Sequence, residues 1–238
     1  RLLSAFHAEN HYVTGNQQPK TWSSVWHTIL FPTKALRRYT TACLTPEKNM
    51  TDFTMTKDIE GIATITWDCP GKSMNVMNMD GIQLLDRLID DALADEAVRG
   101  IIITSGKKDF AGGMDLNVLA DMKASSGDNP AQGVFDGIMM MHSALRKIEL
   151  AGMDFKTKKG GKPTATVLPG TAMGIGLELP MSTHRIFAAN NPKAKIGFPE
   201  ILVGLFPGAG GTTRLVRKLG ALGASPYLLE GKSLSPNK

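Results

Sequence analysis

The chain is poor in cysteine and has no long apolar run. Its 238 residues include two cysteines, Cys43 and Cys69, and a disulfide framework would need more. Nowhere does the sequence approach the roughly 18 consecutive apolar residues that a membrane-spanning helix needs. We therefore expect a protein of a reducing compartment without a membrane span, and we favour the bacterial cytoplasm.

The glycine-rich stretches lack the spacing of nucleotide-binding loops. A dinucleotide fingerprint reads G-x-G-x-x-G, but Leu179 and Thr213 stand where the third glycine of the two nearest matches would be. A phosphate-binding P-loop needs a glycine five residues before its GK[ST] triplet, where the two GKS triplets have Thr66 and Pro226. The histidines of this part of the chain have no acids or cysteines at metal-ligand spacing, so we expect no metal site.

Positive charge is concentrated at the start of the chain. Residues 1–49 hold six basic and two acidic residues, so they carry +4 of the formal net charge of +5. This tail has no sustained hydrophobic period, and we expect it to be a disordered or non-native extension. A transit peptide is the alternative, and it would imply the mitochondrial matrix. Met50 or Met55 could each be a natural start.

A regular hydrophobic pattern begins at about Met55. Short alternating or continuous apolar runs predict strands, and apolar residues at intervals of three and four predict helices. The strands are expected over residues 61–68, 98–106, 162–170 and 184–190, and the helices over 79–95 and 133–150. The isoleucine-rich second strand is typical of a strand buried on both faces. This alternation predicts α/β layering in one domain that covers residues 50–238.

Two glycine-containing loops each follow a predicted strand and precede a helix. They are FAGGMDL, residues 110–116, and GTAMGIG, residues 170–176. Glycines let another group approach closely, and free N–H groups at a helix start can hold a developing negative charge. Two such loops converging on one oxygen would form an oxyanion hole, although tight turns would also explain the glycines. Asp115 is expected to cap its helix rather than to catalyse.

Three motifs, in this order, resemble the enoyl-CoA hydratase (crotonase) superfamily. They are FAGGMDL, GTAMGIGLEL and IGFPEILVGLFPGAGGTTRL, and the resemblance runs from about Gly61 to Ser235. It is to the form found at the front of the multifunctional fatty-acid oxidation α subunit. The resemblance implies a crotonase-like spiral of β-β-α turns and an acyl-CoA thioester as substrate. Because such domains continue with further helices, we expect this one to be incomplete at its C-terminus.

The resemblance also implies roles for individual residues. By motif position, Glu178 and Glu200 would be catalytic, and the backbone N–H groups of Met114 and Ile175 would bind the thioester oxygen. Ile175 stands where most members have glycine, which narrows the space beside the acyl chain. Positions implied at the acyl-CoA substrate are Lys72, Ser73 and Met74 of the GKSMNVMN stretch, Gly112, Gly113, Asp115 and Leu116 of the first loop, and Gly174 and Gly208.

Some of these residues also have plainer interpretations. Either glutamate taken alone could be an acid at a helix surface or a helix start. Lys72 and Lys162 are candidates for binding the phosphates of coenzyme A, but a lone lysine in a loop is more often simply solvated. Gly208 equally suits a turn that packs against the next helix.

Three functions remain open from the sequence. A hydratase needs a base, an acid and a stabilised oxyanion, and the presence of two acids favours it. An isomerase that shifts the double bond would need only one acid. A module that binds coenzyme A or nucleic acid without catalysis is the third, suggested by the basic tail.

The resemblance has consequences for partners and cofactors. We expect a homo-oligomer or a fatty-acid oxidation complex that contains thiolase, and no nucleic-acid partner. No cofactor is expected within these residues. NAD would be needed only if the parent chain continued into a 3-hydroxyacyl-CoA dehydrogenase domain.

Overall fold

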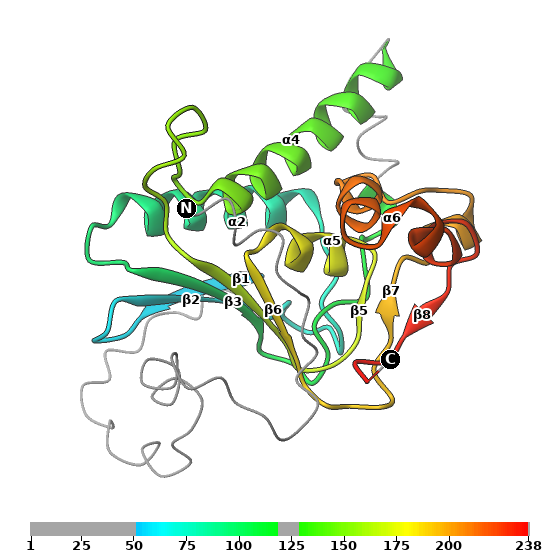
Figure 1. Ribbon diagram of the computed structural model, residues 1–238, viewed down its shortest axis with the longest axis horizontal. Coiled ribbons are helices and arrows are strands. Elements are labelled where there is room, and N and C mark those ends of the chain that lie inside the picture. The colour runs from blue at the N-terminus through cyan, green and yellow to red at the C-terminus, as the bar shows by residue number, and fades with distance from the viewer. Residues whose placement is uncertain (1–50, 119–128, 238) are drawn as a thin grey trace. The chain divides into compact units, whose positions relative to one another are not determined.

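The computed structural model describes residues 51–118 and 129–237. The chain divides into two units, Arg1–Asn49 and Met50–Lys238, and the described residues belong to the second (Figure 1). The prediction of an extension over residues 1–49 therefore lies outside the described residues. Within the described ranges, no helix has the length and apolarity needed to cross a membrane.

Short strands and longer helices alternate along this unit. In chain order the elements are β1 (Phe53–Lys57), β2 (Ile62–Trp67), α2 (Met79–Ala94), β3 (Gly100–Ser105), α4 (Pro130–Leu150), β4 (Thr164–Leu168), β5 (Ala172–Met173), α5 (Ile175–Ser182), β6 (Arg185–Ala188), β7 (Ile196–Gly197), the 3₁₀ helix η2 (Glu200–Val203), α6 (Gly211–Leu229) and β8 (Ser233–Leu234). The predicted strands and helices all occur, within a few residues of their expected bounds.

The larger sheet has the strand order β1-β2-β3-β4-β6. β1 pairs antiparallel with β2, whereas β2, β3, β4 and β6 pair in parallel. The parallel connections contain α2 and α4, which lie over the same face of the sheet (Figure 1). The predicted α/β layering is confirmed.

One face of the central strands is much better buried than the other. In β3, Ile101 and Ile103 are 2% and 0% exposed, whereas Ile102 between them is only half-buried. The sequence predicted burial on both faces of this strand, and that prediction is wrong for the described structure. The reason is that α2 and α4 both cover the same face (Figure 1).

Strand β1 was not predicted, because it directly follows the irregular tail. Its residue Phe53 is buried and stacks on Trp67 of β2, with ring centroids 5.1 Å apart. Trp67 in turn meets the edge of Phe110, with centroids 5.8 Å apart. The three rings join the outer strand to the loop that follows β3.

Both long helices start at an asparagine cap. The side chain of Asn78 accepts a hydrogen bond from the N–H of Gly81 at the start of α2. The side chain of Asn129 accepts from the N–H of Gln132, and Pro130 occupies the first helical position of α4. Because proline and asparagine favour these positions, α4 starts three residues before the predicted residue 133.

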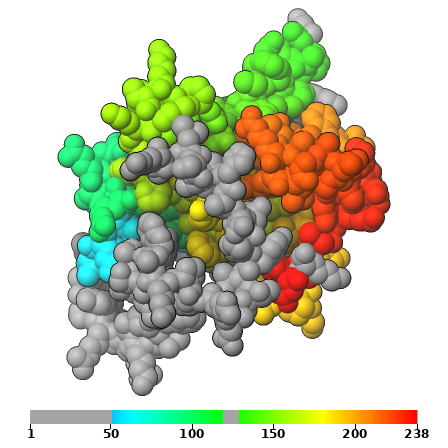
Figure 2. Space-filling view, in the orientation of Figure 1, coloured from blue at the N-terminus to red at the C-terminus, as the bar shows by residue number. Residues whose placement is uncertain are grey.

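A smaller sheet and two helices complete the unit. β7 pairs in parallel with β5 and antiparallel with β8, while α5 contacts α6. α6 and the C-terminal residues, orange to red, form one flank of the surface in Figure 2. α5 is the buried element of this group, since all eight of its residues are buried.

Candidate active site

The two glycine-containing loops lie side by side. Ala111 and Ala172 form a parallel bridge between them, and the N–H of Met173 donates to the carbonyl oxygen of Ala111 over 3.0 Å. A Cβ atom built on Gly174 would lie 3.7 Å from the Cα atom of Gly113. The loops that the sequence placed after separate strands therefore meet.

Each loop presents a backbone N–H group that has no acceptor in the described part of the chain. On either side of Met114, the carbonyl of Gly113 accepts from the N–H of Met77 and the N–H of Asp115 donates to the carbonyl of Met77. Ile175 is the first residue of α5, where an N–H has no partner within the helix. Among the described residues, neither the Met114 N–H nor the Ile175 N–H has an acceptor. Both groups can therefore donate to an oxygen of a bound molecule.

Gly174 brings a carboxylate close to the start of α5. It caps the helix with φ 57° and ψ −127°, a backbone conformation that favours glycine. A Cβ atom at this position would lie 2.9 Å from Oε1 of Glu200. A side chain here would therefore push Glu200 away from the two loops.

Glu178 is a buried carboxylate held by the backbone of another segment. It lies on α5 and is 3% exposed. Its Oε1 atom accepts from the N–H groups of Ala209 and Gly211, each over 2.8 Å. A Cβ atom on Gly211 would lie 2.8 Å from Cγ of Glu178, so only glycine permits this approach. Both bonds go to one oxygen, and Oε2 takes no part in them.

Burial makes Glu178 a weaker acid than an ordinary glutamate. Removal from water raises its pKa from 4.5 to about 7, and the charge of Glu200 adds to the rise. The hydrogen bonds from Gly211 and Ala209 act in the opposite direction. A carboxyl group with a pKa near neutrality can both accept and donate a proton under ordinary conditions.

Glu200 is the first residue of η2 and is half-buried. Burial raises the pKa of its carboxyl group, against the effect of a hydrogen bond from its own backbone N–H. Its Oε2 atom is buried and has no donor among the described residues. Because buried carboxylate oxygens are rarely left unpaired, this atom is suited to bind a water molecule or a substrate proton.

Glu178→Gln is expected to stabilise the fold at alkaline pH. The folded-state pKa of about 7 exceeds the ordinary 4.5, so folding binds a proton. The contribution of that proton to stability is fully present below pH 4.5 and is lost as the pH rises through 7. Glutamine keeps the acceptor oxygen but carries no charge. By chemical denaturation, we expect the variant to exceed the wild type by up to about 3 kcal/mol near pH 8 and to match it near pH 4. A difference that does not change with pH would contradict the raised pKa.

The other predicted substrate positions lie in the first loop, residues 110–116, or beside it. Lys72 lies 3.6 Å from the carboxylate of Asp115, which accepts the N–H of Asn117 over 3.1 Å, as expected of a helix cap. Ser73 and Gly112 are exposed, and the sulfur of Met74 packs against Gly112. Leu116 is 63% exposed.

Two further predicted positions flank the glutamates. Gly208 directly precedes Ala209, which donates to Glu178. The side chain of Ile175 is 3% exposed and belongs to the main hydrophobic cluster. Its bulk is therefore packed in the core of the unit.

Asn75 is a residue that sequence reasoning missed. Its side chain is fully buried, and Oδ1 accepts from the N–H of Cys69 over 2.9 Å. Its Nδ2 atom lies 2.9 Å from each of three acceptors, the carbonyl oxygens of Trp67 and Phe110 and the hydroxyl of Ser105. Asn75 therefore ties the GKSMN stretch to the loop that carries Met114. Its position beside the GKS triplet was the available signal.

Asn75→Ala is expected to destabilise the protein. The substitution leaves the buried N–H of Cys69 and the carbonyl oxygen of Phe110 without the partner that Asn75 supplied, and such groups are costly to leave unpaired. We expect the free energy of unfolding to fall by about 2–3 kcal/mol in a denaturant titration. Asn117→Ala, at an exposed asparagine, is the control and should change it by less than about 0.5 kcal/mol. Equal effects would contradict the role of Asn75.

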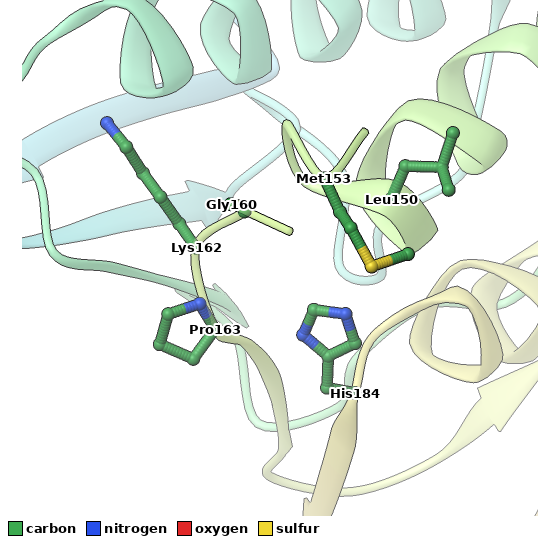
Figure 3. A pocket seen from close by; sticks show the side chains of 7 residues that line it. Leu150, Met153, Gly160, Lys162, Pro163 and His184 are labelled. Carbon is green, nitrogen blue, oxygen red and sulfur yellow. The ribbon is translucent and has the colours of Figure 1, made fainter. Parts of the chain in front are cut away.

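Lys162, one of the two lysines considered for the phosphates of coenzyme A, binds within the protein. Its ammonium group donates to the carbonyl oxygens of Ala92 and Asp95, over 2.8 and 2.6 Å, at the end of α2. The negative end of a helix attracts a cation, which explains this position. Lys162 lines a separate cavity of about 140 Å³, where its side chain points away from His184 (Figure 3). None of the predicted catalytic residues lines this cavity.

Comparisons with known proteins show the family of the chain. A family model described as enoyl-CoA hydratase/isomerase matches residues 57–238. The fatty acid oxidation complex subunit alpha of Shewanella oneidensis is 30% identical over 187 residues, which are 78% of this chain and 24% of that protein. The corresponding subunit of Shewanella baltica is 31% identical with the same coverage. The chain thus spans about a quarter of the length of these curated relatives.

Solved structures show the same fold. An enoyl-CoA hydratase from Geobacillus kaustophilus is 25% identical, with a TM-score of 0.64 over 79% of this chain and 64% of that one. One from Thermoplasma volcanium is 26% identical, with a TM-score of 0.65 over 78% and 66%. The fold is therefore the crotonase-like α/β fold. The chain belongs to the enoyl-CoA hydratase/isomerase family.

Proposed function

We propose that this chain is an enoyl-CoA hydratase, which adds water to trans-2-enoyl-CoA in fatty-acid β-oxidation. The observation that carries the proposal is the closeness of two carboxylates, the buried Glu178 and the half-buried Glu200, beside Gly174. The N–H groups of Met114 and Ile175, which have no acceptor among the residues that the structure describes, belong to the two glycine-containing loops beside these carboxylates.

The chemistry of hydration accounts for each part of this arrangement. One carboxylate takes a proton from water while the water oxygen bonds to C3 of the substrate. The other carboxyl group gives a proton to C2. The thioester oxygen gains negative charge between these events, and two N–H donors would stabilise it. A single such donor contributes about 100- to 1000-fold in measured cases.

An isomerase on the same scaffold is the second candidate. It would move one proton between two carbons and would need only one carboxylate. The raised pKa of both glutamates favours the hydratase, since both are poised for proton transfer.

Two assays with the full chain distinguish these functions. Hydration of crotonyl-CoA removes the absorbance of the conjugated thioester, whereas isomerisation of a 3-enoyl-CoA creates it. We expect the wild type to remove the absorbance of crotonyl-CoA rapidly. Glu200→Gln should lose this activity, whereas Glu60→Gln, at an exposed glutamate, should keep it. Gain of absorbance from the 3-enoyl-CoA without any hydration would favour the isomerase. Binding without turnover of either would favour a module without catalysis.

The curated relatives are named as subunits of a fatty acid oxidation complex, which suggests a larger assembly. We further propose that the parent protein carries a 3-hydroxyacyl-CoA dehydrogenase domain that uses NAD and that it joins a thiolase-containing complex or a homo-oligomer. Copurification of thiolase and NAD-dependent oxidation of 3-hydroxyacyl-CoA by the parent protein would test this.

A further inference from the structure

Arg214 lies behind the segment that holds Glu178. It belongs to the first turn of α6, and its side chain is 11% exposed. Its Nη1 atom donates to the carbonyl oxygen of Ala209 over 3.1 Å. The N–H groups of Ala209 and Gly211 donate to Glu178. The guanidinium therefore binds the same short segment, Ala209–Gly211, that holds Glu178.

The guanidinium is anchored in turn to α4. Its Nη2 atom lies 3.3 Å from Oε2 of Glu149, which also accepts from the exposed Arg146 over 2.7 Å. Burial acts to raise the pKa of Glu149, but the hydrogen bond from Arg146 and the charge of Arg214 outweigh it and lower this pKa. Glu149 therefore stays ionised and keeps its partner.

We propose that Arg214 is a positioning residue, which fixes the Ala209–Gly211 segment against Glu178 by joining it to Glu149 of α4. The proposal rests on the proposed hydratase function for its kinetic consequences. Arg214 touches neither substrate nor reacting atoms in this account, and it acts only through Glu178.

Two physical effects make this role consequential. Displacing catalytic groups by about 1 Å can lower a rate about 100-fold, and the segment that holds Oε1 of Glu178 has its outward anchor in Arg214. The positive charge of Arg214 also lowers the pKa of Glu178, opposing the larger effect of burial. Loss of Arg214 would therefore move Glu178 and make its ionised form harder to reach.

Few charged groups of the described residues lie around Glu178. Glu200 of η2 and Arg214 of α6 affect its pKa directly. From α4, His142 lies against Gly210. From β6, Arg185 is exposed and donates to a backbone carbonyl. Of these groups, Arg214 is the one that both bonds the Ala209–Gly211 segment and lowers the pKa of Glu178.

The test compares Arg214→Met, Arg214→Lys and the control Arg146→Met in the full chain. Arg146 donates to the same oxygen of Glu149 but does not contact the segment that holds Glu178. For crotonyl-CoA hydration we expect Arg214→Met to lower kcat about 10- to 100-fold with KM changed less than about threefold. The limb of its pH–rate profile that reports Glu178 should move to higher pH. Arg214→Lys should keep the wild-type limb more closely, because it keeps the charge, and Arg146→Met should behave as the wild type.

A second readout does not depend on hydratase activity. Carbon-13 NMR of labelled glutamate follows the titration of Glu178, with its signal assigned by Glu178→Gln. We expect Arg214→Met to raise the pKa of Glu178 and Arg214→Lys to raise it less. If the wild type adds no water but this titration shifts, the positioning role stands and the hydratase proposal fails.

Three results would overturn the role of Arg214. The first is a folded Arg214→Met with kcat within about twofold of the wild type. The second is an unchanged Glu178 titration in that variant. The third is an equal loss of activity in Arg146→Met. If Arg214→Met fails to fold, Arg214→Lys is the deciding variant. A full wild-type rate with lysine would contradict the need for a guanidinium that binds Ala209 and Glu149 at the same time.

Discussion

Replacing Glu178 with glutamine should lower kcat for crotonyl-CoA hydration by about 100- to 10,000-fold, the range typical of lost general acid–base catalysis. Glutamine still accepts the N–H groups of Ala209 and Gly211, so the segment that holds it should remain in place. KM should change little, because Glu178 is assigned to proton transfer and not to binding of coenzyme A. The measurement is the initial rate of absorbance loss, with folding checked by circular dichroism.

The control for this substitution is Glu60→Gln. Glu60 is an exposed glutamate, and its replacement should leave the rate within about twofold of the wild type. If Glu178→Gln were folded and kept more than about a tenth of wild-type activity, Glu178 would not be an essential acid or base.

Removing one backbone donor should have an effect of similar size. Ile175→Pro deletes the N–H at the first position of α5, where proline suits a helix. We expect kcat to fall about 100- to 1000-fold, the loss measured for a single oxyanion-hole donor. The change also removes buried side-chain atoms of Ile175, so a matched variant is required.

Ile175→Ala is that variant, because it shortens the side chain and keeps the N–H. It should retain at least about a tenth of wild-type kcat while its free energy of unfolding falls by about 2–4 kcal/mol, as for other buried isoleucines. Equal losses of kcat in folded Ile175→Pro and Ile175→Ala would show that the side chain matters and the N–H does not.

Much of the central fold could be predicted because its signals are local. The spacing of Leu85 and Ile89 on α2, and of Met141, Leu145 and Ile148 on α4, marks the buried helix faces. These residues repeat every three or four positions whatever they pack against. The strands of the larger sheet were visible for the same reason, except for β1, whose pairing with β2 is needed to distinguish it from the tail.

The candidate site was accessible only in part. The glycines of the two loops and the acids Glu178 and Glu200 stand in recognisable motifs, so they could be named from the sequence. Asn75 and Arg214 could not be assigned a role, because Phe110 and Glu149, which join them to other elements, lie far away in the chain and meet them only in the fold. For the same reason the contact of Lys162 with the end of α2 could not be predicted, since nothing local shows that this helix end lies beside it.

Stability and catalysis place opposite demands on Glu178. Burial of an ionisable carboxyl group destabilises the folded protein at neutral and alkaline pH, yet the same burial brings its pKa to about 7. Strained or costly groups are typical of functional sites. The combination predicts that Glu178→Gln gains stability and loses activity in the same variant.

The most direct test of the shared role of the two carboxylates is a double-mutant cycle. The kcat for crotonyl-CoA hydration would be measured for the wild type, Glu178→Gln, Glu200→Gln and the double variant. If both proton transfers are needed in the same reaction, each single variant should lose about 100-fold or more, and the double variant no more than about tenfold beyond the worse single one. Losses that multiply in full, or a single variant that keeps most of its activity, would contradict the joint action of Glu178 and Glu200.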